Sequence, residues 1–196
     1  MPSASERDIT RSALMANAFK LVAESLINES DRGTIVLATA WLDESLTKVL
    51  TKYMRPAGKT DDLLNPGKPI GDFGTKIMLA ERLGLVAPNL LKSLNRCRKL
   101  RNDFAHIASE LTFETPSVRD RIQLILDENE DLLIVMGDTL RDAGMEFENG
   151  NDPLILKHIL DRLGSKPLFQ YACAFLNSAL ALIEFDIEPV EPQFHF

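Results

Sequence analysis

The residues best suited to chemistry lie in one segment, Leu90 to Ala108, whose centre reads NRCRKLRNDFAHIA. A helix turns about 100° per residue, so one face of this segment is apolar: Leu90, Leu94, Cys97, Phe104 and Ala108. Arg101 falls inside that stripe, about 20° from Leu90. A buried guanidinium is costly unless a carboxylate pairs with it. We therefore predict that Arg101 is buried and paired with an acid of a neighbouring helix: Asp31, Asp43 or Glu44.

The opposite face of the same segment is polar and carries Asn95, Lys99, Asn102 and His106. Asn102 and His106 lie one turn apart and can share a hydrogen bond or a ligand, whereas Arg101 and His106 diverge by about 140° on a regular helix. Two interpretations stay open. Either Arg101 clamps two helices beside exposed polar residues, or Arg101, Asn102 and His106 face a phosphate-bearing partner, brought together by a helix distortion or a second subunit.

Other motifs fail on spacing. The tripeptide GKT at 58–60 matches the end of a phosphate-binding loop motif. That motif requires a glycine five positions before Gly58, and this sequence has Tyr53 there. The acids of 127–131 resemble the start of a calcium loop, yet Leu132 stands where that loop needs glycine. His158 has no second His or Cys at ligand spacing. No helix-turn-helix is evident either. We expect no metal site, no cofactor and no catalytic residue.

Length and composition indicate one ordinary globular domain of 196 residues, with 45% hydrophobic and 26% charged residues. The two cysteines, Cys97 and Cys173, lie in apolar stretches without zinc spacing, and the N-terminus lacks the apolar core of a signal peptide. These features predict a cytoplasmic protein with buried thiols. The most apolar stretch, 168–183, is interrupted by Gln170 and Asn177, and we expect it to be too short and too polar to span a membrane.

The charge is unevenly distributed along the chain. The formal net charge is -7, but nine acids against Arg141 give segment 127–152 a balance of -8, so the remainder sums to +1. Within that remainder, window 92–101 holds five cations and no acid. Phosphate neutralisation needs clustered Lys and Arg. We therefore expect DNA binding only weakly or together with a partner.

Apolar residues recur at helical spacing, which predicts an all-α, single-domain bundle over 1–186 and an extended tail over 187–196. The predicted helices are 6–28, 31–54, 73–83, 88–108, 116–126, 138–143, 153–163 and 167–185. The helix at 31–54 carries the stripe Ile35, Ala38, Leu42, Leu46, Val49 and Tyr53. Because its first half, 35–38, is apolar on every side, we expect this helix to be central and surrounded by neighbours.

Five phrases of the sequence resemble the bacterial mannitol operon repressor family. They are 29–33 (ESDRG), 40–46 (AWLDESL), 69–85 (PIG, then KI and LGL), 98–106 (RKLRNDFAH) and 119–121 (RDR), in the family's order over about 26–126. The resemblance implies an all-α bundle that represses transcription of a sugar-alcohol uptake operon. It ends near Asp127.

A second resemblance overlaps the first. Arg101-Asn102 followed by His106 is similar to the Arg-x4-His signature of HEPN helical domains, many of which are metal-independent RNases that work as dimers. The resemblance implies that Arg101 holds a phosphate and that His106 takes part in proton transfer during attack by a ribose 2′-hydroxyl.

From these observations we predict a non-enzymatic helical transcriptional regulator that acts through a protein partner or through assisted DNA binding. An RNA-cleaving or RNA-binding HEPN-like domain is the alternative, and a homodimer is the geometry that would join Arg101 and His106 in one site. The candidate site residues lie on two helices: Arg98, Arg101, Asn102, Asp103 and His106 on one, and Asp31, Arg32, Asp43 and Glu44 on the central helix.

Overall fold

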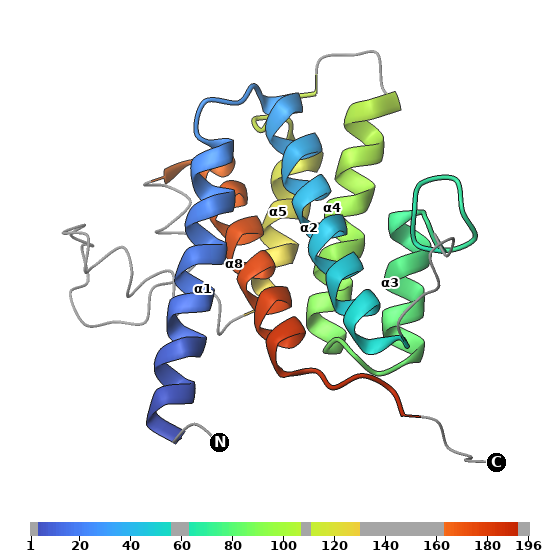
Figure 1. Cartoon of the computed structure of the whole chain (residues 1–196). Coiled ribbons are helices and arrows are strands. Elements are labelled where there is room, and N and C mark those ends of the chain that lie inside the picture. Colours follow the sequence, from blue (N-terminus) through green and yellow to red (C-terminus); the bar gives the residue numbers. More distant parts are fainter. Residues whose placement is uncertain (1–3, 56–62, 107–110, 130–162, 192–196) are drawn as a thin grey trace.

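The computed structural model describes residues 4–55, 63–106, 111–129 and 163–191, and within these residues every regular element is an α-helix (Figure 1). The helices are α1 (Ala4–Leu26), α2 (Asp31–Tyr53), α3 (Phe73–Arg82), α4 (Pro88–His106), α5 (Pro116–Asp127) and α8 (Ser165–Asp186). The predicted all-α class is confirmed. The helix expected at 138–143 lies outside the described residues, as do the end of the tail, 192–196, and all of the helix expected at 153–163 except Leu163.

Local side-chain chemistry explains where the helices begin and end. The Ser30 hydroxyl accepts a hydrogen bond from the Gly33 amide at 3.0 Å and starts α2, which satisfies one of the unpaired amides of a first turn. Asp72 does the same for α3, because its carboxylate accepts from the Gly74 amide at 3.0 Å. Gly84 follows the C-cap residue of α3 with a φ of +66°, a left-handed conformation that favours glycine.

Helix α2 is central, as predicted, and packs against α1, α3, α4 and α8 (Figure 1). Its buried residues include five of the six predicted stripe positions: Ile35, Ala38, Leu42, Leu46 and Val49. The expectation that 35–38 is enclosed on every side is wrong, because Val36 is 42% exposed. Val36 belongs to an outer face of α2 that reaches the surface together with Ala40, Glu44 and Lys48.

Helix α8 closes the core by packing against α1, α2 and α5. It is six residues longer than the apolar stretch 168–183, so the expectation that its length excludes a membrane span does not hold. By length and composition α8 could cross a membrane, with a mean hydropathy of 1.4 over its most apolar window. Half of that window is buried in this structure, which is the behaviour of a core helix.

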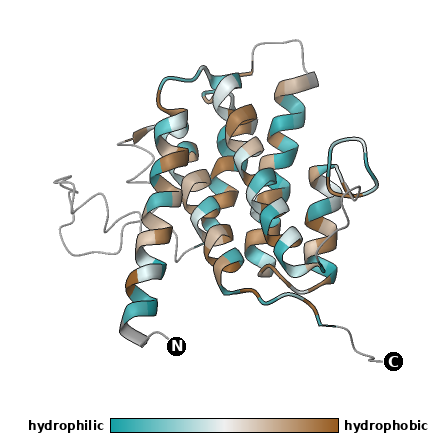
Figure 2. Cartoon of the chain, viewed as in Figure 1, coloured by the Kyte–Doolittle hydropathy of each residue, from teal (hydrophilic) through white to brown (hydrophobic). Residues whose placement is uncertain are grey.

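The core also contains both cysteines, one on α4 and one on α8. Cys97 and Cys173 are free thiols with no exposed surface, and their sulfur atoms lie 4.0 Å apart. The prediction of buried thiols is confirmed. Burial is the main cause that raises the pKa of the Cys173 thiol well above its ordinary value, followed by the contact with Cys97. Figure 2 shows that hydrophilic and hydrophobic residues alternate around the helices of the bundle.

Candidate functional site

Arg101 lies at the surface, so the prediction that it is buried against a carboxylate is wrong. Its guanidinium donates to the Asn102 side-chain oxygen at 3.1 Å, and no carboxylate of the described residues lies within ion-pair distance of it. The buried residues in the second half of α4 are Cys97, Leu100 and Phe104. Arg101 is therefore at the border of the apolar face, where it lines a pocket together with Thr39 and Ala40 of α2.

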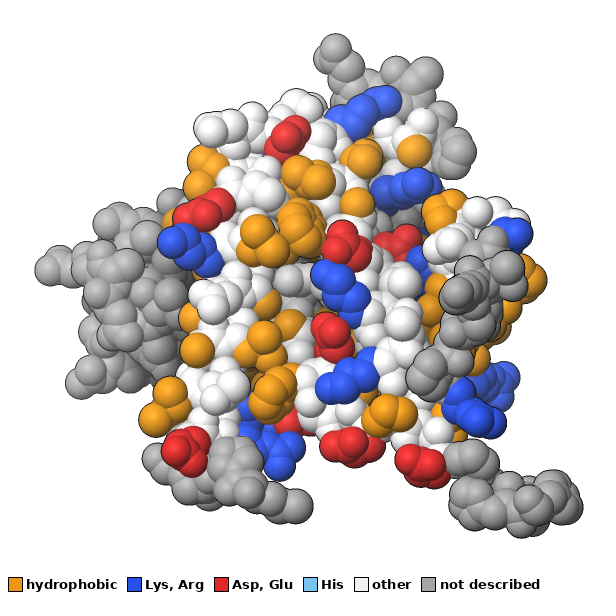
Figure 3. Space-filling view, in the orientation of Figure 1, with side chains coloured by type: hydrophobic (Ala, Val, Ile, Leu, Met, Phe, Trp, Pro, Cys, Tyr) orange, Lys and Arg blue, Asp and Glu red, His pale blue; other side chains and the backbone are white. Residues whose placement is uncertain are grey.

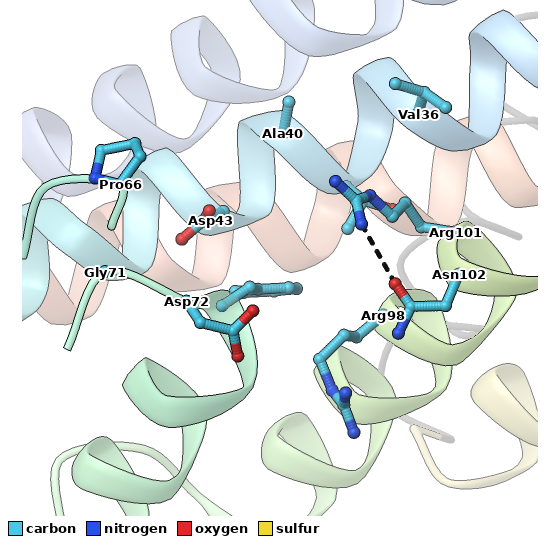
Figure 4. Close-up of a pocket in the computed structure, with 11 residues that line it drawn as sticks. Val36, Ala40, Asp43, Pro66, Gly71, Asp72, Arg98, Arg101 and Asn102 are labelled. Atoms are coloured by element: carbon cyan, nitrogen blue, oxygen red, sulfur yellow. Dashed lines mark hydrogen bonds between the residues drawn. The ribbon is translucent and has the colours of Figure 1, made fainter. Parts of the chain in front are cut away.

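That pocket has a volume of about 290 Å³ and lies between α2, α4 and the segment that leads into α3 (Figure 4). Its lining includes four charged residues and one amide: Asp43, Asp72, Arg98, Arg101 and Asn102. Figure 4 shows Arg101 reaching across the pocket toward α2, while the end of Arg98 turns away from it. The remaining wall consists of small or apolar residues: Val36, Thr39, Ala40, Pro66, Gly71 and Phe73.

The pocket wall before α3 is held in one shape by its own backbone. Ile70 donates to the Leu63 carbonyl at 3.1 Å, and the Gly71 amide donates to Lys68 at 2.9 Å. A Cβ atom at Gly71 would lie only 2.0 Å from the Asn65 carbonyl oxygen, so only glycine allows this close approach. The wall is thus formed without a ligand.

Asp43 is fixed in the pocket by a buried lysine. The Lys76 ammonium of α3 lies 2.8 Å from one Asp43 oxygen, and its side chain is 5% exposed compared with 33% for Asp43. The pair joins α2 to α3. Asp43 compensates the charge of the buried Lys76 ammonium, while the Asp43 carboxylate itself remains partly open to solvent.

The other candidate residues on the two helices serve mainly structural contacts. Asp31 accepts from the Phe113 amide at 3.0 Å and pairs with Lys166 at 3.3 Å, which joins the start of α2 to α8. Glu44 forms an exposed pair one turn away on α2, with Lys48 at 2.7 Å, and Asp103 pairs with Arg121 of α5. Arg32 is exposed near the start of α2.

The structure brings together only part of the predicted site. Asp43, Arg98, Arg101 and Asn102 line one pocket, whereas Asp31, Glu44 and Asp103 do not. His106 is the last residue of α4, and its side chain lies outside the described residues. The structure therefore gives no distance between His106 and Arg101.

Sequence reasoning missed Lys76 and Asp72, although signals for both are present. Lys76 lies on the same helical face as the buried Phe73, Ile77 and Ala80, a cation in an apolar stripe like that of Arg101. Asp72 directly precedes a helix, where an acid caps unpaired amides. The apolar stripe predicted a buried cation paired with an acid of α2, but it placed that cation at Arg101 of α4, whereas the structure has it at Lys76 of α3.

Four cations of α4 reach the surface: Lys92 and Lys99 on its outward side, and Arg98 and Arg101 on the flank beside the pocket. We use the name α4 basic surface for Lys92, Arg98, Lys99 and Arg101, which form no ion pair with an acid among residues 4–55, 63–106, 111–129 and 163–191. The fifth cation of window 92–101, Arg96, is instead paired with Glu128 at the end of α5. In Figure 3, basic side chains are prominent over the upper part of α4, while acidic and basic side chains alternate down the middle of the face.

Comparison with known proteins shows that this chain shares its all-helical fold with two solved structures. The chain matches no protein-family model and no curated protein sequence. Its fold resembles the crystal structure of a possible transcriptional regulator, YggD, from Shigella flexneri, with a TM-score of 0.58, 14% identity, and coverage of 84% of this chain and 98% of that one. The fold also resembles the X-ray structure of the MtlR–HPr complex from Escherichia coli, with a TM-score of 0.55, 16% identity, and coverage of 86% and 99%. At these identities the likeness is one of fold.

Proposed function

We propose that this chain is a non-enzymatic regulator of the mannitol operon repressor type, which works in the cytoplasm by binding a regulatory protein partner. The fold is shared with a possible transcriptional regulator and with MtlR, whose solved structure is a complex with the protein HPr. The sequence phrases over about 26–126 support the same family. The observation that carries the proposal is the α4 basic surface, because unpaired exposed cations are available to a partner.

The chemistry of that surface defines the partner. The described part of α4 holds a single acid, Asp103, and Arg121 already neutralises it. Complementary charges steer two proteins together and discriminate between partners. The partner should therefore present acidic residues to α4. Because MtlR binds HPr, the HPr of the organism that encodes this chain is the first partner to examine.

Binding to HPr tests the proposal. Isothermal titration calorimetry with purified HPr should give a saturable one-to-one complex. Lys99→Glu should weaken it at least about tenfold, since about 1.4 kcal/mol corresponds to a factor of ten. Lys20→Glu, with the same charge change on α1, is the matched control and should bind as the unmodified chain does. Figure 1 shows α1 and α4 separated by α2 and α8.

Two results would contradict this proposal in different ways. Absence of a complex at about 100 µM of each protein would exclude HPr as the partner, because regulatory complexes weaker than that fall in the range of nonspecific encounters. Equal weakening by Lys99→Glu and Lys20→Glu would exclude the α4 basic surface as the interface and indicate a general charge effect.

Transcriptional repression through DNA is part of the proposal only with assistance from a partner. Four unpaired cations on one helix act against a total charge of -7, which opposes tight binding to a polyanion. The HEPN-like alternative differs in its chemistry, since it predicts metal-free cleavage of labelled RNA that a His106→Ala variant lacks. We propose that the chain leaves such RNA intact.

A further inference from the structure

The pocket between α2, α4 and the segment before α3 shares Arg98 and Arg101 with the α4 basic surface, but its concave shape and its Asp43 carboxylate play no part in the proposed partner binding. It combines a donor end, at Arg101 and Asn102, with an acceptor, the Asp43 carboxylate. A protein partner that covers the outside of α4 does not require a concave space of about 290 Å³, which is close to the size of small-molecule sites. We propose that this pocket binds a small hydroxylated oxyanion.

Arg101 supplies the positive end of the pocket. One N–H group of its guanidinium donates to Asn102, and the planar group carries four more donors in a fork that fits two oxygens of a phosphate or carboxylate. The hydrogen bond to Asn102 orients the guanidinium. No described carboxylate occupies its remaining donors.

The acids of the pocket are partly neutralised, so they do not exclude an anion. Asp43 is paired with the buried Lys76, and one oxygen of Asp72 accepts from the Gly74 and Thr75 amides at the start of α3. The end of Arg98 turns away from the pocket, so the charges of Arg101 and Lys76 balance those of Asp43 and Asp72. Because both acids already accept hydrogen bonds within the protein, the open donors of Arg101 favour an anionic ligand.

Asp43 sets the second requirement on the ligand. Lys76 occupies one Asp43 oxygen, whereas no described residue hydrogen-bonds to the other. A carboxylate oxygen at a pocket wall accepts from a hydroxyl group. A ligand with an oxyanion at Arg101 and a hydroxyl at Asp43 satisfies both groups at once. Phosphate monoesters and hydroxycarboxylates share this chemistry.

The wall formed by 63–71 makes the pocket suitable for selective binding. Its backbone hydrogen bonds and the close approach of Gly71 to Asn65 fix its shape before any ligand arrives. A preformed wall lowers the ordering cost of binding. The site therefore needs no rearrangement of the bundle to accept a molecule of a few carbon atoms.

Ligand titrations on the full chain test this inference. They leave Asp43 unchanged, because this residue also compensates the buried Lys76. The probes are glycerol 3-phosphate and glycerate, which carry both groups, with inorganic phosphate and glycerol as single-group controls. We expect one of the two-group probes to bind saturably with a Kd of about 1 mM or below, followed by calorimetry or ligand-observed NMR. Inorganic phosphate should bind at least about fivefold more weakly and glycerol should not bind, because each makes only one set of contacts. Which two-group probe binds better distinguishes a phosphate from a carboxylate.

Protein variants then locate the binding. Arg101→Ala should weaken the better probe at least about tenfold, while Lys99→Ala, an equal charge loss on the same helix outside the pocket, should change binding less than about twofold. Arg101 is exposed, so both variants should fold, which their unfolding temperatures check. No saturable binding of either two-group probe at about 20 mM, or equal effects of the two variants, would overturn the inference. HPr binding is measured separately, so failure of one does not decide the other.

Discussion

At the scale of single residues, Lys76 and Arg101 show why an apolar stripe does not determine which cation is buried. Both occupy helical positions that a wheel places near the core. Lys76 is 4% exposed, because Asp43 of α2 lies 2.8 Å from its ammonium group and compensates the charge. Arg101 faces the small residues Thr39 and Ala40 and extends along a pocket instead. Whether a cation is buried depends on whether the helix packed against it supplies a carboxylate, and a single sequence does not show which residues of two helices meet.

The Lys76–Asp43 pair should respond unequally to the loss of either member. Asp43→Ala leaves a buried ammonium group unpaired and should lower the free energy of unfolding by about 3 kcal/mol. Lys76→Met keeps the apolar stem, and the partly exposed Asp43 can rehydrate, so its cost should be about 1 kcal/mol or less. Urea denaturation of both variants and of the double variant checks this. Strict additivity of the two changes would mean that the pair has no coupling energy.

At the scale of elements, most helices could be predicted and their exposure could not. The Ser30 start of α2 and the left-handed glycine at 84 follow from local chemistry, because a hydroxyl caps unpaired amides and glycine allows a positive φ. The α8 helix begins at Ser165, two residues before the predicted start at Pro167. Proline is tolerated anywhere in the first helical turn, so Pro167 indicates that turn but not its first residue. Val36 is exposed although its neighbours are apolar, since which side of α2 remains uncovered depends on helices distant in sequence.

The candidate site illustrates the same limit. The segment that carries Arg98, Arg101 and Asn102 could be singled out from residue types, and it does line a pocket. The pocket itself depends on how α3 and its preceding segment lie against α2 and α4, which requires long-range contacts. The S···S distance of 4.0 Å between Cys97 and Cys173 is equally invisible in a sequence where they are 76 residues apart.

The link between α4 and α5 predicts a pH-dependent stability. Arg96 donates two hydrogen bonds to Glu128, at 2.8 and 2.6 Å, and this holds the pKa of the Glu128 carboxyl below its ordinary value. A lowered carboxyl pKa stabilises the fold at neutral pH, and that stability is lost as pH falls through the folded-state pKa.

Glu128→Gln should therefore lower the free energy of unfolding at pH 7 by about 1 kcal/mol. The difference from the unmodified chain should shrink as pH falls below the ordinary range of carboxyl groups and through the lowered pKa of Glu128. Urea unfolding at pH 7 and pH 3 measures both. Glu24→Gln, which removes an exposed pair with Lys20, is the control and should change little. A gap of equal size at both pH values would contradict the ion-pair explanation.

At the scale of the whole molecule, the order of the helices divides the protein into two sides. Helices α1 and α8 lie on one side of α2, and α4 and α3 lie on the other (Figure 1). The α4 basic surface and the pocket therefore belong to the same side, although they serve different proposed ligands. Such an arrangement would let a small molecule in the pocket influence a protein bound to α4, because both proposed binding sites include Arg101 and Arg98.

The central claim is that a regulatory protein binds the exposed side of α4. The most direct measurement maps the HPr contact by recording backbone amide NMR shifts of the isotope-labelled chain during titration with unlabelled HPr. We predict shifts concentrated on α4 and the neighbouring segment 63–73, with α1 unchanged. Shifts concentrated on α1, or saturating HPr without any shift on α4, would contradict it.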